Sequence, residues 1–77
     1  MKPIKYTRHA KNRMRQHNTA ETEVEAAIAE PDFTEPSLEG RINVWKKTDE
    51  KFLRVTYKDE PARILVITAV KKKKGWR

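Results

Sequence analysis

The side chains best suited to chemistry lie in the run from Tyr6 to Asn18, which holds both histidines of the chain and no acidic residue. His9 and Arg13 are four residues apart, so in a helix they lie on one face. Histidine carries protons near neutral pH, and the arginine guanidinium binds phosphate through paired hydrogen bonds. This spacing indicates either half of a site that handles phosphate or a surface helix with solvated charges.

A second set of candidates lies in the later half of the chain. Arg54 is in the middle of the predicted strand FLRVTY, where burial of an unpaired arginine is costly. No predicted strand contains an acidic partner for this arginine, so we expect Arg54 to bind an anion. Tyr57 in the same strand and Thr68 in the last strand could orient that anion, although both are also ordinary strand residues.

These residues match the needs of RNA cleavage by internal transfer. One group must take the proton of the 2′-OH, another must protonate the leaving 5′-oxygen, and a third must stabilise the charge on the phosphate. His9 is expected to be the acid or the base. Arg13 and Arg54 are expected to hold the scissile phosphate. Thr68 or Tyr57 is expected to orient it.

No metal or cofactor is expected. His9 and His17 are eight residues apart and are expected on different faces of their helix, and no cluster of His, Asp and Glu has the spacing of metal ligands. His17 is expected only to favour the negative end of the helix dipole. The chain has no cysteine, which removes thiol chemistry and suits a cytoplasmic protein.

The net charge of +7 is distributed in blocks. Residues 1–17 carry six Lys/Arg and no acid, residues 18–40 carry seven Asp/Glu and no base, and residues 41–77 carry twelve bases and four acids. Basic blocks that meet in space would form a surface for RNA or for an acidic partner protein, whereas scattered charges would serve only solubility. A tryptophan in the basic C-terminal run adds a surface on which a base could stack. The expected nucleic-acid-binding residues are Arg8, Lys11, Arg15, Lys71, Lys72, Lys73, Lys74 and Trp76.

The length of 77 residues predicts a single domain over 1–77, in which residues 71–77 form a basic, solvated tail. Thr7 and Thr19 are expected to cap helices over about 8–17 and from Thr19 to Pro31. The following loop, 31–40, should tuck Phe33 and Leu38 under the core.

Hydrophobic patterns predict strands over 41–47, 51–58 and 62–70, joined by short turns. The expected architecture is α+β, with two N-terminal helices followed by an antiparallel sheet of three to four strands. No apolar stretch approaches the length of a membrane span, and the N-terminus has no hydrophobic export segment.

The pattern of short motifs resembles the DUF4258 family, whose small members look like the RelE/BrnT-type toxins of toxin–antitoxin systems. The resemblance covers roughly residues 6–70, and it rests on His9-Ala10 with Arg13-Met14, Val24 and Ile28 before Pro31-Asp32, Leu53-Arg54-Val55, Tyr57, and Ile67-Thr68-Ala69.

The resemblance implies a fold of the RelE/barnase kind, a metal-independent ribonuclease, and an antitoxin protein encoded alongside as partner. His9 and Arg13 match the helix motif of the family, and Arg54 matches its strand arginine. Thr68 matches its last-strand threonine. Val70 stands where an aromatic residue often follows the Ile-Thr-Ala motif, so no aromatic role is expected at that position.

Two functions therefore stay open from the sequence. The first is a toxin-like endoribonuclease acting on RNA. The second is a non-catalytic module in which the same basic face only binds RNA or an acidic partner. A third reading, a structural protein whose charges serve solvation alone, would leave the His9/Arg13 face without a ligand.

Overall fold

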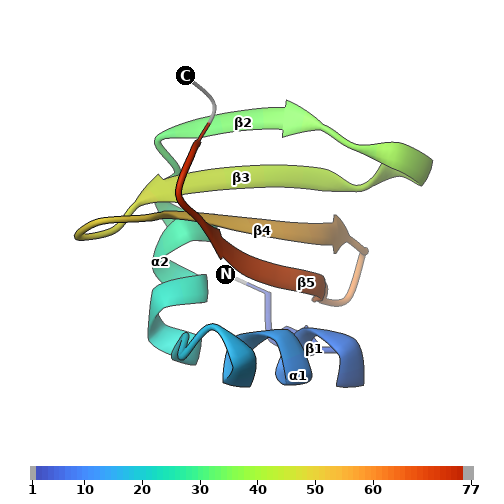
Figure 1. The fold of residues 1–77 in the computed structure, drawn as a ribbon. Helices are drawn as coiled ribbons and strands as arrows, with labels where there is room; N and C mark the ends of the chain where they lie inside the picture. The colour runs from blue at the N-terminus through green and yellow to red at the C-terminus, as the bar shows by residue number, and fades with distance from the viewer. Residues whose placement is uncertain (1, 76–77) are drawn as a thin grey trace.

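The computed structural model describes residues 2–75, which form two helices and five strands (Figure 1). In chain order these are β1 (Ile4–Tyr6), α1 (Arg8–Gln16), α2 (Glu21–Ala29), β2 (Phe33–Pro36), the 3-10 turn η1 (Leu38–Gly40), β3 (Ile42–Lys47), β4 (Phe52–Asp59) and β5 (Ile64–Lys72).

The five strands form one mixed sheet in the order β1-β5-β4-β3-β2. The antiparallel meander of β3, β4 and β5 confirms the three predicted strands. The predicted strand number and the purely antiparallel arrangement are wrong, because β2 adds an antiparallel edge and β1 pairs parallel to β5. The α+β class is therefore confirmed, but one strand precedes the helices.

The two unpredicted strands are short edge strands beside prolines. Pro3 precedes β1, and its carbonyl accepts a hydrogen bond from the Ile64 N–H at 2.9 Å. Pro36 ends β2 at the sheet edge, where a missing N–H leaves no neighbouring strand unsatisfied. Strands of three and four residues are too short to show an alternating pattern, so the sequence predicts neither of them.

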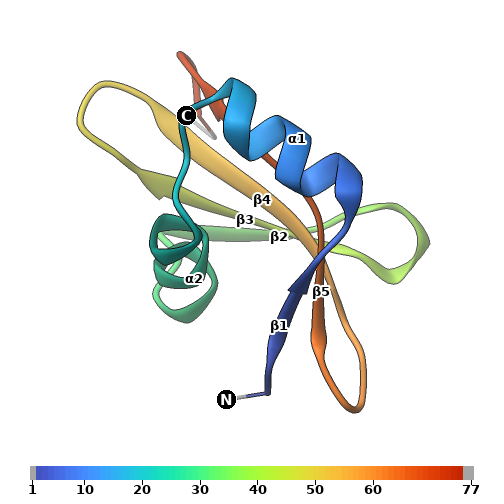
Figure 2. The same cartoon turned by 90° about the horizontal axis from the view of Figure 1, so that it is seen from below.

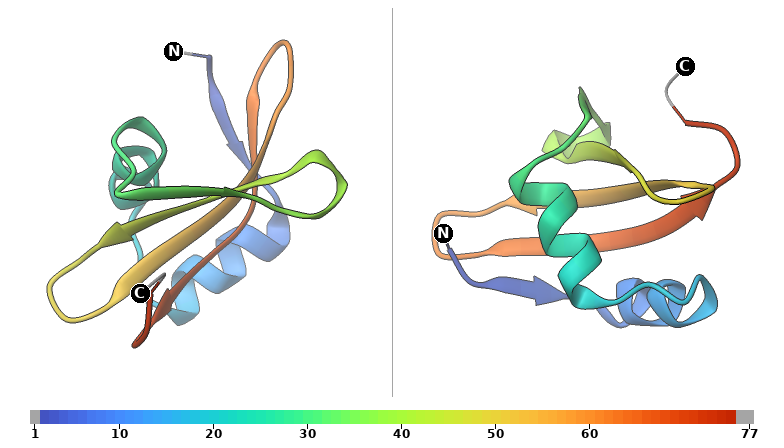
Figure 3. Two further views of the ribbon diagram at one scale, coloured as in Figure 1. Left: turned by 90° about the horizontal axis from the view of Figure 1, so that it is seen from above. Right: turned by 90° about the vertical axis from the view of Figure 1, so that its left-hand side faces the viewer.

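Both helices contribute to a single core on one face of the sheet. Figure 3 (right) shows α2 in front of the strands with α1 along their lower edge. Short apolar side chains let the helices approach the sheet closely, and the burial of this apolar surface is the main stabilising contribution. The buried cluster consists of Ala10, Met14, Val24, Ala27, Val44, Leu53, Val55, Val66 and Ala69.

The ends of α1 follow standard capping chemistry. The Thr7 hydroxyl oxygen accepts the Ala10 N–H at 3.0 Å, which confirms the predicted N-cap. At the other end, the Thr19 N–H donates to the Met14 carbonyl at 2.8 Å and the Asn18 N–H donates to the Arg15 carbonyl at 3.3 Å. These two bonds form a Schellman motif, with Asn18 in the left-handed conformation at φ 52°.

The start of α2 differs from the prediction. Thr19 does not cap this helix, because it is buried in the link that ends α1. Ala20 occupies the N-cap position, and the Glu23 carboxylate reaches back to accept the Ala20 N–H at 3.1 Å. This contact satisfies the backbone N–H of the N-cap residue, as the glutamate of a capping box does.

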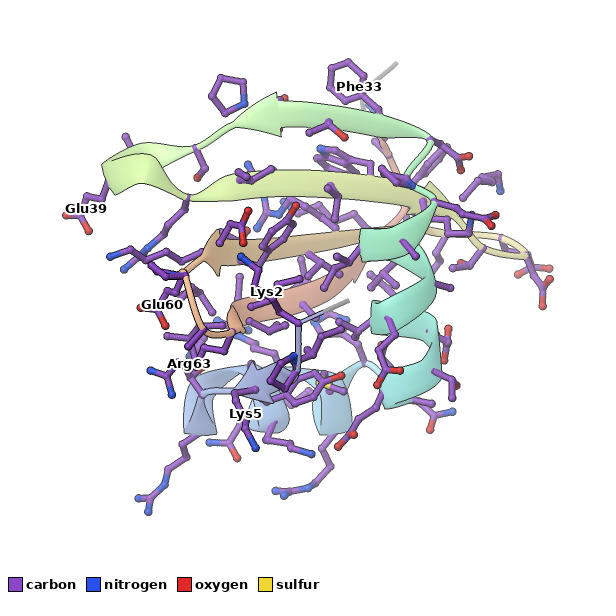
Figure 4. The ribbon with its side chains drawn as sticks, turned by 180° about the vertical axis from the view of Figure 1, so that it is seen from behind. Lys2, Lys5, Phe33, Glu39, Glu60 and Arg63 are labelled. Carbon is purple, nitrogen blue, oxygen red and sulfur yellow. The ribbon has the colours of Figure 1, made fainter. Side chains whose placement is uncertain are left out.

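Two further expectations about the periphery are corrected. Leu38 is 81% exposed and Phe33 is 38% exposed, so neither tucks under the core. Figure 4 shows Phe33 on the outer strand β2. The basic tail does not begin at residue 71, because β5 continues through Lys72, which pairs with Phe52. Within residues 2–75, no helix is long and apolar enough to cross a membrane.

Candidate functional site

The unequal lengths of β1 and β5 create room for a site beside the sheet. β1 pairs only with Ile64–Val66, so the second half of β5 has α1 as its neighbour (Figure 2). Two hydrogen bonds from Thr7 fix the start of α1 to β5, one from its N–H to the Val66 carbonyl and one from its hydroxyl to the Ile67 carbonyl, each at 3.1 Å. One side of α1 therefore packs into the core, and the adjoining side lies beside the C-terminal end of β5.

An irregularity in β5 turns the site residues outward. Thr56 pairs with Thr68 and Tyr57 pairs with Val66, so Ile67 is an extra residue in the ladder. Without this bulge, Thr68 would share the helix-covered face with Val66. The bulge places Thr68 on the same face as Arg54, opposite the buried cluster. Bulges of this kind re-aim side chains and are frequent beside active sites.

The result is a hollow of about 400 Å³ between α1 and the ends of β4 and β5. We call it the cationic hollow. None of its lining residues carries a carboxylate, and residues 2–75 contain no group of three His, Asp and Glu that could hold a metal ion. Its walls are formed by His9, Arg13, His17, Arg54, Thr68, Val70, Lys71 and Lys72.

Four of the five predicted catalytic residues meet in this hollow. His9 and Arg13 enter from α1, and Arg54 enters from near the start of β4. Thr68 lies on β5, two residues from the partner of Arg54. Residues that are far apart in the sequence thus line one surface, as a common anion would require.

Arg13 remains available to a ligand. The acidic residues of α2 do not pair with Arg13, whose Nη1 donates instead to the side-chain carbonyl of the neutral Gln16 at 3.4 Å. The acidic helix α2 instead forms an ion pair with Lys11 through Glu21. Within the described chain, the Arg13 guanidinium forms no ion pair.

Arg54 is partly buried and incompletely satisfied. Its Nε atom has no hydrogen-bond partner among residues 2–75, and its guanidinium carbon lies 5.8 Å from the centre of the Trp45 ring. The expectation that no strand contains an acid is wrong, because Glu35 lies in β2. However, Glu35 accepts hydrogen bonds from Trp45 at 3.1 Å and Asn43 at 3.3 Å. The buried Arg54 donor thus lacks the partner that such groups normally have.

His17 is the site residue that sequence reasoning missed. It was expected to act as a cation at the helix end, yet burial and the nearby charges of Arg13, Lys51 and Lys71 lower its pKa below the ordinary value of 6.5. The neutral imidazole can accept a proton at pH 7. His9, Arg13 and His17 follow one another at steps of four, and this spacing could have revealed that α1 presents all three to one hollow.

Lys71 forms the fixed edge of the cationic hollow. Its ammonium lies 3.1 Å from the Glu23 carboxylate and donates to the Asn18 carbonyl at 3.4 Å. The pKa of Glu23 is lowered by the Ala20 N–H and by Lys71. Lys71 therefore ties the end of β5 to both helices, whereas Lys72 is exposed.

The structure does not bring Tyr57 to the hollow. Tyr57 packs against the core on the helix-covered face, and burial together with Asp59 raises the pKa of its phenol. A phenol there cannot orient an anion held on the opposite face.

The predicted RNA-binding residues divide into separate groups. Lys71 and Lys72 line the cationic hollow, and Lys73 and Lys74 are exposed beyond it. The cations at positions 8, 11 and 15 lie on another side of α1, where Lys11 also stacks 4.8 Å from the Tyr6 ring centre. Trp76 lies outside the described residues.

The fold and site define a small α+β protein with a cluster of cationic side chains beside a bulged strand. The sequence profile of a domain of unknown function, DUF4258, matches residues 6–71, so the chain belongs to this family. No curated protein and no solved structure matches the chain significantly.

Proposed function

We propose that this protein is a toxin-like, metal-independent endoribonuclease of a toxin–antitoxin system, with a domain of the RelE/barnase-like kind. The observation that carries the proposal is the convergence of His9, Arg13, Arg54 and Thr68 on a hollow without carboxylates. Membership of DUF4258 supports the resemblance on which the toxin assignment rests.

The cationic hollow suits the phosphate of an RNA backbone. Arg13 and Arg54 offer guanidinium donors, and Arg54 holds a buried Nε without a partner among the described residues. A phosphate in the hollow would accept hydrogen bonds from these guanidinium groups, and a hydrogen bond to a charged group contributes about 1.5–3 kcal/mol. The Thr68 hydroxyl would donate to a second phosphate oxygen.

The reaction we propose is internal transfer. The 2′-oxygen attacks phosphorus, the P–O2′ bond forms and the P–O5′ bond breaks, giving a 2′,3′-cyclic phosphate and a 5′-hydroxyl. A base takes the 2′-OH proton and an acid gives a proton to the 5′-oxygen. Residues eight positions apart in a helix are about 12 Å apart at Cα, so His9 and His17 stand at the two ends of the hollow. We assign His17 as the base, because its lowered pKa keeps it neutral, and His9 as the acid.

The non-catalytic alternative uses the same hollow. A module that only binds RNA or an acidic partner needs the cations but not the two histidines. It would show salt-sensitive RNA binding without any cleavage product. The presence of a histidine at each end of the row favours the enzyme.

An antitoxin protein is the proposed partner, and the cytoplasm is the proposed location. The cationic hollow would attract an acidic segment of such a partner as well as RNA. A partner bound there would block the phosphate site directly.

The test is digestion of single-stranded RNA by the purified protein in EDTA. Wild type should yield 5′-hydroxyl products, and His9→Ala and Arg13→Ala should each slow cleavage at least about 100-fold. Arg63→Ala is the matched control, because Arg63 pairs with Glu60 at 2.7 Å in the β4–β5 turn (Figure 4) and does not line the hollow. Absence of cleavage by wild type, or unchanged cleavage by both variants, overturns the proposal.

A further inference from the structure

A second hollow of about 560 Å³ adjoins the cationic hollow. It lies between the C-terminal end of α1 and the turn that joins β3 to β4. The two hollows share His17 and Lys71, so they form one continuous surface. The remaining lining residues are Asn18, Glu23, Thr48, Asp49, Glu50 and Lys51. Its volume falls in the range of small-ligand pockets, roughly 300–1,000 Å³.

The two hollows differ in charge. The cationic hollow has no carboxylate in its lining, whereas the second hollow has three carboxylates beside Lys51 and the shared Lys71. Glu23 is engaged by the Ala20 N–H and by Lys71, each at 3.1 Å. The carboxylates of Asp49 and Glu50 form no hydrogen bond or ion pair with residues 2–75, so they remain open to a ligand that donates hydrogen bonds.

Asn18 adds a neutral group to this lining. Its left-handed backbone at φ 52° ends α1, a position where glycine is the usual residue. Asparagine tolerates this conformation and also supplies an amide with both donors and an acceptor. The Asn18 side-chain amide has no hydrogen bond within the described part of the chain, and it lines the hollow.

We propose that the second hollow, which we call the base hollow, binds the nucleobase next to the phosphate held in the cationic hollow, and that it selects bases with an exocyclic amino group. The inference rests on the proposed function for the phosphate anchor alone. Adenine, cytosine and guanine each offer an amino donor to the carboxylates of Asp49 and Glu50. Uracil offers carbonyl oxygens on both sides of its single N–H, and these oxygens repel a carboxylate.

This arrangement separates the two halves of a nucleotide by charge. The anionic phosphate meets His9, Arg13 and Arg54, and the neutral base meets acceptors that would repel a second phosphate. A strand of RNA would therefore enter in one orientation, with a base directed towards the β3–β4 turn. The substrate class that follows is single-stranded RNA, because a paired base has its amino group engaged.

The test measures binding of adenosine, cytidine and uridine 3′-monophosphates to the wild-type protein by calorimetry. The uridine nucleotide should bind about tenfold more weakly than the other two, the discrimination that one good side-chain contact to a base supplies. The Asp49→Asn/Glu50→Gln double variant should bring the three affinities within about twofold of one another. The ratio is the readout, because removal of two negative charges also strengthens binding of every nucleotide phosphate.

Two further variants sharpen the result. Asn18→Gly keeps the left-handed cap and should weaken binding of all three nucleotides without loss of thermal stability. Glu39→Gln is the matched control, because Glu39 lies in the β2–β3 connection at the far end of β3 (Figure 4) and should leave the ratio unchanged. Equal affinities for the wild type, or a preference that survives the double variant, overturns the inference.

The outcome is separable from the test of the endoribonuclease. Nucleotide preference without RNA cleavage supports the base hollow and contradicts the enzyme. Cleavage with a preference that ignores positions 49 and 50 supports the enzyme and contradicts the base hollow.

Discussion

Arg54 contains the one buried side-chain nitrogen or oxygen atom in residues 2–75 that lacks a hydrogen-bond partner. A buried donor without a partner lowers stability, and such groups are retained where function needs them. Its neighbours explain the orientation, because the Trp45 ring lies against the guanidinium and Glu35 is occupied by Trp45 and Asn43. The charge of Arg54, which lines the hollow, is therefore not neutralised by Glu35.

Replacement of Arg54 should separate stability from binding. Arg54→Met loses a cation–π contact worth about 0.5–1 kcal/mol but also removes the unsatisfied Nε. We expect the free energy of unfolding to change by less than about 1 kcal/mol, while affinity for inorganic phosphate falls at least tenfold. Urea unfolding and calorimetry check the two effects. Arg63→Met should leave phosphate binding intact, and equal losses in both variants would contradict a specific role for Arg54.

His17 makes the stability depend on pH in a defined direction. The folded protein lowers the pKa of His17, so the unfolded chain takes up a proton near 6.5 while the folded protein still resists it. Stability should therefore fall as the pH drops below about 6.5 and be fully present above it. His17→Gln removes this loss, so the variant should gain stability relative to wild type between pH 7.5 and 5.5 in urea unfolding. A difference that is constant over this interval argues against the lowered pKa.

At the scale of elements, the link between β1 and α1 positions the whole site. The Thr7 hydroxyl accepts from the Ala10 N–H and donates to the Ile67 carbonyl at the bulge. One side chain thus caps α1 and holds it against the strand that carries Thr68. The position of the His9/Arg13 face relative to β5 depends on this link.

Thr7→Ala should disturb both the helix and the site. The loss of an N-cap and a hydrogen bond should cost about 1–2 kcal/mol of unfolding free energy. RNA cleavage should fall more than this loss of folded protein explains, because α1 is no longer fixed to the bulge. Thr7→Ser keeps the hydroxyl and should retain most of the stability and the activity. A serine variant as damaged as the alanine variant would show that the methyl group, and not the hydroxyl, matters.

Strong local sequence patterns made α1 and the β3–β4–β5 meander predictable. The bulge in β5 and the strands β1 and β2 have no such pattern. Thr7 and the His9/Arg13 spacing mark the first helix clearly. The bulge at Ile67 left no trace, because the segment ARILVITAV is apolar on both faces and a shift of register changes no visible pattern. β1 and β2 depend on pairing with distant strands, which the local sequence does not encode.

Strand alternation and helix spacing in the sequence predict most of the residues that line the site. Tyr57 is three residues from Arg54 in the same strand, so alternation puts the two side chains on opposite faces, as the structure has them. His9, Arg13, Arg54 and Thr68 all reached one hollow. His17 was missed because two residues eight positions apart do not share a helix face directly. Arg13 lies between them at four residues from each, and it joins the two histidines along one side of α1.

At the scale of the whole molecule, the acidic and basic blocks of the sequence lie on different sides of α1. The acidic helix α2 engages Lys11 through Glu21 and Tyr6 through Glu25, and Glu21 and Glu25 raise the pKa of the Tyr6 phenol beyond the effect of burial. On the other side of α1, no acid lines the cationic hollow. Arg13, Arg54, Lys71 and Lys72 therefore lie together where α1 meets the end of β5.

The central claim is that this hollow holds the scissile phosphate of RNA. It is tested most directly by an NMR titration with a short single-stranded RNA that carries one 2′-deoxynucleotide, since this nucleotide cannot undergo internal transfer. The account predicts that the largest shifts fall on His9, Arg13, His17, Arg54 and Thr68, and that the pKa of His17 rises in the complex as the phosphate favours its protonated form. Shifts centred on the Arg8/Lys11/Arg15 side of α1, with an unchanged pKa of His17, would contradict it.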